Sequence, residues 1–408
     1  MGGIATGRTT ISGFLRSEDC LATLAAIRSM GVTVADSGDE LTIAGAGPDG
    51  LQQPAGPLDL GNSGTAMRLL LGVLAAQPFT ATLTGDASLL QRPMERVAGP
   101  LREMGASIDT DGGKAPLYVL GARPLRPIDY SLSVASAQLK SAILLAGLWA
   151  NGRTAVASPG PSRDHTERML ETMGVDVERH EPNAVAITGP ATLTGQAIEV
   201  PADFSSAAFF IVAGLLGAEE GITIPAVGVN PSRTGLLTIL GDMGANIELR
   251  NERFCGAEPI ADIVVQSSSL DATEIGAELV DLSIDELPIV CIAATAARGI
   301  TRISGAAELR HKESDRIRVM AEGLATIGIN VRERPDGLEI EGGDIRGGRI
   351  DSAGDHRIAM AFVIASLRAS ETIEILDTGP VATSFPDFQA VAAQAGFQIE
   401  ILSGSSDG

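Results

Sequence analysis

The sequence predicts an α/β protein of two similar domains, each made of three units that run strand, buried helix, strand, outer helix, strand. A helix that ends in a glycine and leads into a strand recurs roughly every 70 to 85 residues. A β-branched strand precedes each of these helices, and a nearly all-apolar helix precedes that strand in five of the six units. Because 408 residues suit two domains, we place the boundary so that the domains are residues 1–201 and 202–408.

The glycine-terminated helices form the outer helix of each unit. We expect each glycine to adopt the left-handed conformation of a helix C-cap, after which a strand begins. The six segments are AAIRSMGVTV (25–34), GPLREMGASI (99–108), RMLETMGVDV (168–177), TILGDMGANI (238–247), GLATIGINV (323–331) and the weaker AVAAQAGFQI (390–399). The strands before them read GRTTISG, PFTATLTG, GRTAVAS, GITIPAV, GITRISG and ETIEILD.

The second helix of each unit is apolar nearly all round, which predicts that it lies buried inside its domain. Its five examples are RLLLGVLAA (68–76), KSAILLAGL (140–148), AAFFIVAGLL (207–216), PIVCIAATAA (288–297) and IAMAFVIASL (358–367). The first unit has only what resembles the tail of such a helix, in residues 1–7. We therefore expect the first unit to be incomplete, lacking roughly 30 to 40 N-terminal residues that the repeat demands.

Composition and charge exclude several classes of binding partner for this protein. A net charge of -21 argues against nucleic acid and anionic membranes. No apolar run reaches the ~20 residues that span a bilayer, and no signal peptide is visible. The three cysteines are far apart and lack metal-ligand spacing, so we interpret them as free thiols of a cytoplasmic protein. We expect neither a metal nor a cofactor.

Each buried helix opens with a polar segment, and these openings are candidate anion sites because helix N-termini offer free amides. They are Gly61–Arg68, Ala135–Lys140, Asp203–Ser206, Ile284–Glu286 and Asp355–Arg357. We interpret the third mainly as helix capping. Pseudo-symmetry places the openings on one side of each domain, so two such sides facing each other would form a cleft.

The loops before the outer helices supply the positive charges. They carry Arg92, Arg163, Arg310, Lys312 and Arg316. Arginines pair in bidentate fashion with carboxylates and phosphates. Several such residues in an acidic protein predict small, multiply anionic substrates, two of them by the number of sites. Arg233 of the fourth unit we interpret as a structural or domain-contact residue.

Three residues are candidates for proton transfer. Asp285 stands at a helix start among these bases, which would keep it ionised and suit it to act as a base. Glu313, beside Lys312, could shuttle a proton. His311 is more often a hydrogen-bonding bystander at such a position.

Eight motifs, in order along the chain, resemble those of the 5-enolpyruvylshikimate-3-phosphate synthase family. They are GNSGTAMR (61–68), LQRPMERV (90–97), SAQLKSAILLAGL (136–148), RDHTE (163–167), IDELP (284–288), LRHKESDR (309–316), DHRIAM (355–360) and TSFPDF (383–388). The resemblance implies two similar domains, each of three βαβαββ repeats with the first repeat incomplete, which is the inside-out α/β barrel of the enolpyruvyl transferases. It also implies transfer of the enolpyruvyl group from phosphoenolpyruvate to the 5-hydroxyl of shikimate 3-phosphate, with release of phosphate, in a monomeric enzyme.

The resemblance also implies roles for individual residues. Asp285 would deprotonate the hydroxyl, and Glu313 would help to protonate and deprotonate the methyl group. Shikimate 3-phosphate would be held by Ser136, Ala137, Gln138, Arg163, Asp285 and Lys312. Phosphoenolpyruvate would be held by Gly64, Arg92, Gln138, Arg316 and Arg357.

Two departures from the family pattern stand out. The family's N-terminal Gly-Asp-Lys-Ser-Ile-Ser-His-Arg segment is absent, and its Lys, Ser and Arg bind both substrates. Some members also carry a Lys where this chain has Thr383. Two alternatives therefore stay open: a fragment that binds phosphorylated metabolites without turnover, and the sister enzyme that acts on UDP-N-acetylglucosamine. The second is disfavoured because many of its members carry a Cys in the loop that reads TGDAS (84–88) here.

Overall fold

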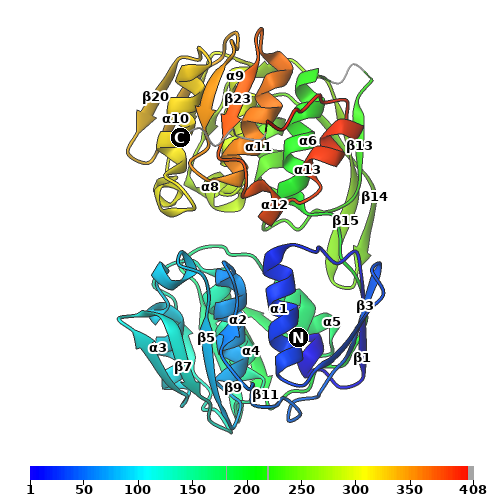
Figure 1. Cartoon of the computed structure of the whole chain (residues 1–408), viewed down its shortest axis with the longest axis vertical. Helices are drawn as coiled ribbons and strands as arrows, with labels where there is room; N and C mark the ends of the chain where they lie inside the picture. The colour runs from blue at the N-terminus through cyan, green and yellow to red at the C-terminus, as the bar shows by residue number, and fades with distance from the viewer. Residues whose placement is uncertain (181, 218–219, 403–408) are drawn as a thin grey trace.

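A computed structural model describes residues 1–180, 182–217 and 220–402 as two lobes, each with its own core (Figure 1). The first lobe contains β1 to β12 and the second β13 to β23. Their hydrophobic cores run from Ile4 to Leu193 and from Phe204 to Ala392. We retain the boundary between residues 201 and 202 as a proposal; it falls in the interval between the two cores.

The second, third and fifth units share one topology, in which the first two strands are parallel and the last two form an antiparallel hairpin. The second unit contains β4 (Leu58–Asp59), α2 (Gly64–Leu74), β5 (Thr80–Thr84), η2 (Leu89–Gln91), α3 (Glu95–Glu103), β6 (Ser107–Asp111) and β7 (Lys114–Leu120). The third contains β8 (Asp129–Ser131), α4 (Ala137–Gly147), β9 (Gly152–Ala157), α5 (His165–Thr172), β10 (Val177–His180) and β11 (Ala184–Gly189). The fifth contains β17 (Glu274–Ile275), α8 (Ala277–Ser283), α9 (Leu287–Thr295), β18 (Ala297–Arg298), β19 (Ile300–Ile303), η3 (Ala307–His311), α10 (Arg316–Thr326), β20 (Val331–Arg334) and β21 (Gly337–Glu341).

The first unit takes its opening strand from a distant part of the chain. It contains η1 (Gly2–Ile4), β1 (Arg8–Ser12), α1 (Glu18–Ser29), β2 (Thr33–Asp36) and β3 (Glu40–Ala44). Strand β12 (Ala197–Glu199) pairs in parallel with β1, in the place that β4 has beside β5. The strand beside β1 therefore comes from residues 197–199, far along the chain.

The fourth and sixth units depart from the common pattern. The fourth has α6 (Phe204–Gly217), β13 (Ile222–Gly228), α7 (Gly235–Asp242), β14 (Asn246–Cys255) and β15 (Glu258–Gln266), followed by β16 (Leu270–Asp271). The sixth has β22 (Gly348–Asp351), α11 (His356–Ala365), η4 (Ser366–Arg368), β23 (Ile373–Leu376), α12 (Val381–Ser384) and α13 (Phe388–Gln394). Residues 397–399, which we predicted as a strand, form none.

The predicted helix caps are confirmed by the backbone. All six glycines that end the outer helices have positive φ, between 85° and 115°. They are Gly31, Gly105, Gly174, Gly244, Gly328 and Gly396. This conformation is easy for glycine, which has no Cβ, and it turns the chain from helix into the next segment.

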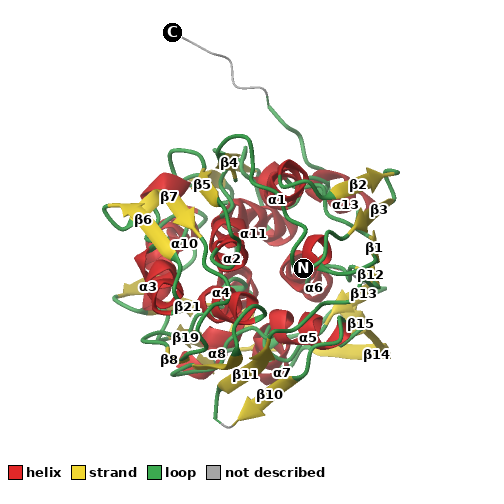
Figure 2. Ribbon diagram, turned by 90° about the horizontal axis from the view of Figure 1, so that it is seen from below, coloured by secondary structure: helices red, strands yellow, loops and turns green. Residues whose placement is uncertain are grey.

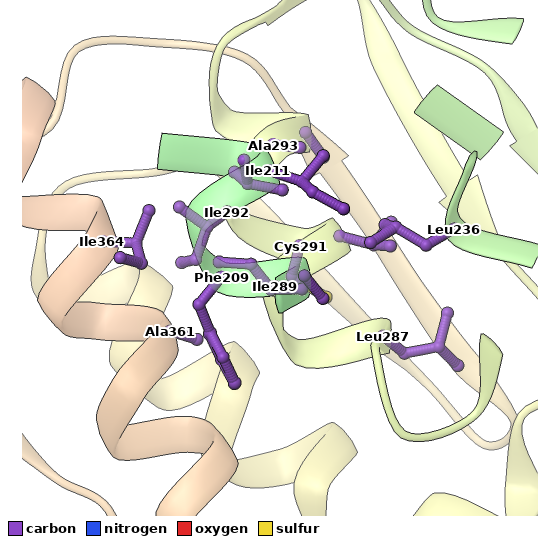
Figure 3. Close-up of a cluster of buried hydrophobic side chains, with 14 of the residues drawn as sticks. Phe209, Ile211, Leu236, Leu287, Ile289, Cys291, Ile292, Ala293, Ala361 and Ile364 are labelled. Carbon is purple, nitrogen blue, oxygen red and sulfur yellow. The ribbon is translucent and has the colours of Figure 1, made fainter. Parts of the chain in front are cut away.

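The apolar helices lie inside the lobes, as predicted. They are α2 and α4 in the first lobe and α6, α9 and α11 in the second, and Figure 2 shows the strands toward the outside of the projection. Figure 3 shows the side chains that three of these helices bury together, among them Phe209, Ile292 and Ala361. None of the helices in the described ranges is long and apolar enough to cross a bilayer.

Glycine allows the two central helices of the first lobe to approach closely. A Cβ on Gly72 of α2 would lie 2.3 Å from the carbonyl oxygen of Ala142 on α4. Because backbone atoms cannot give way as a flexible side chain can, this contact fixes the spacing of the two helices. The N-terminal ends of both helices carry predicted site residues, so the packing also sets their relative position.

Candidate active site

Cationic side chains from both lobes surround one carboxylate, that of Asp285. This residue lies between the end of α8 and the start of α9, and its side chain is 16% exposed. Arg163 of the first lobe donates a hydrogen bond to it at 2.5 Å. In the second lobe, Lys312 Nζ and Arg316 NH1 lie 3.7 and 3.5 Å from Asp285 Oδ1. Arg357 donates to the backbone oxygen of Asp285 at 3.1 Å.

This concentration of positive charge controls the ionisation of Asp285. Burial on its own would raise the pKa of the carboxyl. The nearby cations, Arg357 first and then Arg163, outweigh burial and hold the pKa of Asp285 well below its ordinary value. Asp285 is therefore an anion at neutral pH, as its position in the sequence predicted.

Arg316 is a buried arginine with one end of its guanidinium unsatisfied. It begins α10, and its side chain is 1% exposed. Its Nε donates to Asp355 at 2.7 Å and its NH2 donates to Glu313 at 2.6 Å. Its NH1 has no hydrogen-bond partner among the described residues. A buried polar group left unpaired is costly, so an NH1 beside the cationic cluster indicates a place for an anionic ligand.

The neighbour of this arginine, Asp355, is itself buried and caps the next helix. Its carboxylate accepts from the backbone N–H of Arg357 at the start of α11. Burial opposes ionisation of Asp355, but the charge of Arg316 outweighs it and the pKa lies below the ordinary value. One carboxylate thus holds both Arg316 and the helix start that carries Arg357.

Arg233 proves to be a structural contact within the second lobe, as interpreted. Its NH2 donates to Ser205 Oγ at 2.6 Å, and its NH1 reaches Asp203 at 3.3 Å. The Ser205 hydroxyl in turn donates to Glu286, whose pKa is raised because burial disfavours its charge. These hydrogen bonds hold the start of α6 next to the start of α9.

A second group of predicted residues meets at the starts of α2 and α4 in the first lobe. Gly64 is the first residue of α2, and a Cβ there would lie 3.0 Å from Arg92 NH1. Arg92 NH2 donates to Asn62 Oδ1 at 2.6 Å. Ser136 caps α4, with Ala137 as its first residue. These residues form the first-lobe wall of the candidate site.

Arg68 joins this group; it ends the predicted opening Gly61–Arg68, although the resemblance implied no substrate-binding role for it. Its NH1 donates to Gln138 Oε1 at 2.6 Å, and Gln138 Nε2 donates to Thr65 Oγ1 at 2.9 Å. The signal in the sequence was the spacing of Gly64 and Arg68, which are four residues apart and so share one face of a helix.

The charged residues from 310 to 316 face two different places: Lys312 and Arg316 lie near Asp285, whereas Arg310 contacts a hairpin. Arg310, predicted to face a substrate, turns instead to the β20–β21 hairpin, where it contacts Glu333 and the backbone oxygens of Arg334 and Pro335. It also pairs with Asp315 at 2.9 Å. Its prediction was wrong because these nearby acceptors satisfy its guanidinium. His311 is exposed.

No group of three or more metal-ligating side chains occurs within the described part of the chain. Two histidines, His165 and His356, each follow an aspartate directly in the sequence. His165 contacts Glu258 at 2.6 Å. For His356, burial first and then the charge of Arg357 lower the pKa to about 4, so it is neutral at pH 7.

Comparison with known proteins gives consistent results over nearly the whole chain. Residues 1–391 match the family described as EPSP synthase (3-phosphoshikimate 1-carboxyvinyltransferase). A 3-phosphoshikimate 1-carboxyvinyltransferase of Acidithiobacillus ferrooxidans is 55% identical over 405 residues, which cover 99% of this chain and 93% of that protein. The corresponding protein of Methylococcus capsulatus is 53% identical, with 98% and 92% covered.

Solved structures agree in fold. The EPSP synthase from Acinetobacter baumannii is 50% identical, with a TM-score of 0.91 and coverage of 98% of this chain and 93% of that one. The enolpyruvyl transferase NikO from Streptomyces tendae, at 17% identity and a TM-score of 0.76, shares the fold.

Proposed function

This chain belongs to the EPSP synthase family, and on that premise we propose how its residues transfer the enolpyruvyl group of phosphoenolpyruvate to the 5-hydroxyl of shikimate 3-phosphate. The reaction is a step of the shikimate pathway toward the aromatic amino acids. The substrate oxygen bonds to the enol carbon while the methylene gains a proton. The tetrahedral adduct then loses that proton and its phosphate, which leaves the enolpyruvyl ether.

The observation that carries the proposal concerns the buried NH1 of Arg316, which lies 3.5 Å from Asp285 Oδ1 but makes no hydrogen bond within the described residues. The Arg316 side chain is 1% exposed and pairs with the carboxylates of Glu313 and Asp355 through NH2 and Nε. Its NH1 group can still donate a hydrogen bond to a ligand. An anion at this position would gain charge-assisted hydrogen bonds from a group that has already lost its water. Both anionic ends of phosphoenolpyruvate suit such a donor.

For phosphoenolpyruvate we propose a site between the lobes. Arg316 and Arg357 would bind it from the second lobe, and Gly64, Arg92 and Gln138 from the first. The small space beside Gly64, where a Cβ would already crowd Arg92 NH1 at 3.0 Å, supports a close approach of the ligand to the start of α2. Free amides at that helix start would add to the binding of an anion.

For shikimate 3-phosphate we propose the starts of α4 and α5, with one contribution from the opposite lobe. Ser136, Ala137 and Gln138 begin α4, and Arg163 precedes α5. Asp285 and Lys312 would complete the site. Support comes from the contact of Arg163 with Asp285, since it joins these two sets of residues across the lobes.

Asp285 is proposed as the base that removes the proton from the 5-hydroxyl. The charges of Arg357, Arg163 and Lys312 outweigh burial and lower its pKa, which makes Asp285 a weak base in the protein without substrates. Two bound substrates bring phosphates and carboxylates to the same cations. Neutralising them would raise the pKa of Asp285 and free it from Arg163, so the base would strengthen when both substrates are in place.

Glu313 is proposed to carry the proton to and from the methylene carbon. Its side chain is 40% exposed and accepts from Arg316 NH2 at 2.6 Å. This position links it to the arginine that would bind phosphoenolpyruvate. Lys312, the neighbouring residue, is directed toward Asp285.

An acceptor assay tests the proposal. Phosphate release from phosphoenolpyruvate is measured with shikimate 3-phosphate and, separately, with UDP-N-acetylglucosamine. We expect release with the first acceptor only. Calorimetric binding of shikimate 3-phosphate without any release would favour a chain that binds without turnover, and release with the second acceptor would favour the sister enzyme.

We further propose a monomeric, cytoplasmic enzyme. Both walls of the site come from one chain, so a second copy is not needed to complete it. The three cysteines are free thiols, which suits a reducing compartment. Light scattering after size exclusion tests the monomer, for which a mass near 41.9 kDa is expected.

A further inference from the structure

Helices α4 and α5 of the first lobe are joined by a buried ion pair that the reaction does not use. Lys140 Nζ lies 2.6 Å from Glu167 Oε1, and the two side chains are 7% and 4% exposed. Next to it, the hydroxyls of Ser141 and Thr166 lie 2.7 Å apart and are also buried. Two polar contacts thus connect the first turns of the two helices.

Stability alone is a poor explanation for this pair. The helices around it are otherwise packed with apolar side chains such as Ile143, Leu144 and Leu170. Within the described residues, Glu167 Oε2 has no hydrogen-bond partner. Desolvation offsets most of the attraction in such pairs, and replacing both partners by apolar residues is often neutral or stabilising.

The pair lies directly behind two parts of the candidate site. Lys140 follows Ser136 and Gln138 on α4, by four and two residues. Glu167 follows Arg163 by four residues, so it lies in the first turn of the helix that Arg163 leads into. Movement of one helix start relative to the other would change the distance between these two groups.

We propose that Lys140 and Glu167 are positioning residues whose ion pair fixes the separation between the starts of α4 and α5. The pair would hold Ser136 and Gln138 at the distance from Arg163 that shikimate 3-phosphate requires. This inference rests on the proposed function, in which these three residues bind that substrate.

The physical basis is that an ion pair in a low-dielectric interior has a defined short distance, whereas apolar contacts tolerate sliding. A misplacement of about 1 Å in a site can cost about 100-fold in rate. Shikimate 3-phosphate should be affected more than phosphoenolpyruvate. Most groups proposed for the latter, including Arg92, Arg316 and Arg357, stand on other elements.

The test compares Lys140→Met, Glu167→Leu and the double variant with the wild-type enzyme, by KM for each substrate and by thermal unfolding. Each single variant should lower Tm, since it leaves one charge buried without its partner. The double variant should recover most of the lost Tm. Its KM for shikimate 3-phosphate should nevertheless stay roughly tenfold above wild type, with a change below about threefold for phosphoenolpyruvate.

A double variant with a wild-type KM for shikimate 3-phosphate would overturn the proposal, because the pair would then be only structural. Val119→Ala, in the core on β7, is the control for general loss of stability in the same lobe. It should lower Tm and leave the KM ratio of the substrates unchanged; an equal rise in that ratio would also overturn the proposal. Arg163→Ala distinguishes failure of this inference from failure of the proposed function. If the KM of this variant for shikimate 3-phosphate is that of the wild type, the proposed function is wrong.

Discussion

Among single residues, the sharpest expectation concerns Arg316, whose buried NH1 makes no hydrogen bond within the described residues. Arg316→Ala should weaken phosphoenolpyruvate binding by roughly 10- to 150-fold, which corresponds to the loss of a charge-assisted hydrogen bond of about 1.5–3 kcal/mol. Isothermal calorimetry measures this directly. Arg318→Ala is the matched control, because it lies on the same helix and pairs at the surface with Glu322. Equal affinities for the two variants would remove Arg316 from the site.

Asp285 should affect turnover more than binding. Asp285→Ala removes the proposed base, and general-base catalysis typically contributes about 10²- to 10⁴-fold, so kcat should fall by that order. Dissociation constants should change less, because the cations that bind the anions remain. Asp281→Ala, on the preceding helix α8, is the control. Steady-state kinetics on both variants decides the matter: a wild-type kcat for Asp285→Ala would exclude it as the base.

The residues of the site also show where prediction from sequence stops. Asp285, Lys312, Arg316 and Arg357 do lie together, and each stands near a helix start that could be identified locally. Arg310, from the same charged stretch, does not join them. Its main partners are on the β20–β21 hairpin, more than 20 residues further along the chain. A guanidinium can pair with any carboxylate within reach. Which carboxylate that is depends on how the chain folds and not on the neighbouring sequence.

At the scale of helices and strands, the close packing of α2 against α4 predicts that a side chain at Gly72 lowers stability. Gly72→Ala should lower stability by about 1–3 kcal/mol, because its Cβ meets the Ala142 backbone oxygen at 2.3 Å. Thermal unfolding measures the loss as a drop in Tm. Gly99→Ala in α3 is the matched control, since no non-neighbouring atom of residues 1–180, 182–217 and 220–402 lies within 4 Å of its added Cβ. It should be neutral or slightly stabilising; equal losses for both would contradict the packing argument.

The elements differ in how far their sequence specifies them. The six C-cap glycines were predicted from their position after a helix and before a strand, and all have positive φ. The partner of β1 was not predicted, because β12 lies about 190 residues away. Strand pairing over such a distance depends on which strand edge the rest of the fold leaves open. The strand expected at 397–399 failed for a related reason, since no neighbouring strand is there to pair with it in the described residues.

For the molecule as a whole, the two lobes are connected by contacts between α5 and the β14–β15 hairpin. Asn230 donates to both Asp164 and Glu258, at 2.7 and 3.0 Å. Arg168 binds Asp164 and the backbone oxygen of Ala257. Burial works against ionisation of both acids, but their partners outweigh it and the pKa values of Asp164 and Glu258 lie below the ordinary range.

This connection predicts a loss of stability in acid. A carboxyl whose pKa is lowered by folding stabilises the protein above its unfolded pKa, about 3.9 for Asp and 4.3 for Glu. The stabilisation is lost as the pH falls through the folded values. Tm should therefore drop below about pH 4, and the drop should be smaller in the variant Asp164→Asn with Glu258→Gln. Glu278→Gln, away from the contact, should follow the wild type; an unaltered drop in the double variant would show that these acids do not control it.

By itself, the sequence determined the α/β units, the buried helices, the glycine caps and the family, because these follow from periodicity and residue types that are neighbours in the chain. The tertiary structure decided that β12 completes the first sheet, that Arg310 turns away from the site, and that Arg163 crosses the lobes to Asp285. The physical reason is that a charged side chain or a strand edge pairs with whatever packing brings within reach. That proximity is set by the whole chain and not by the residues on either side.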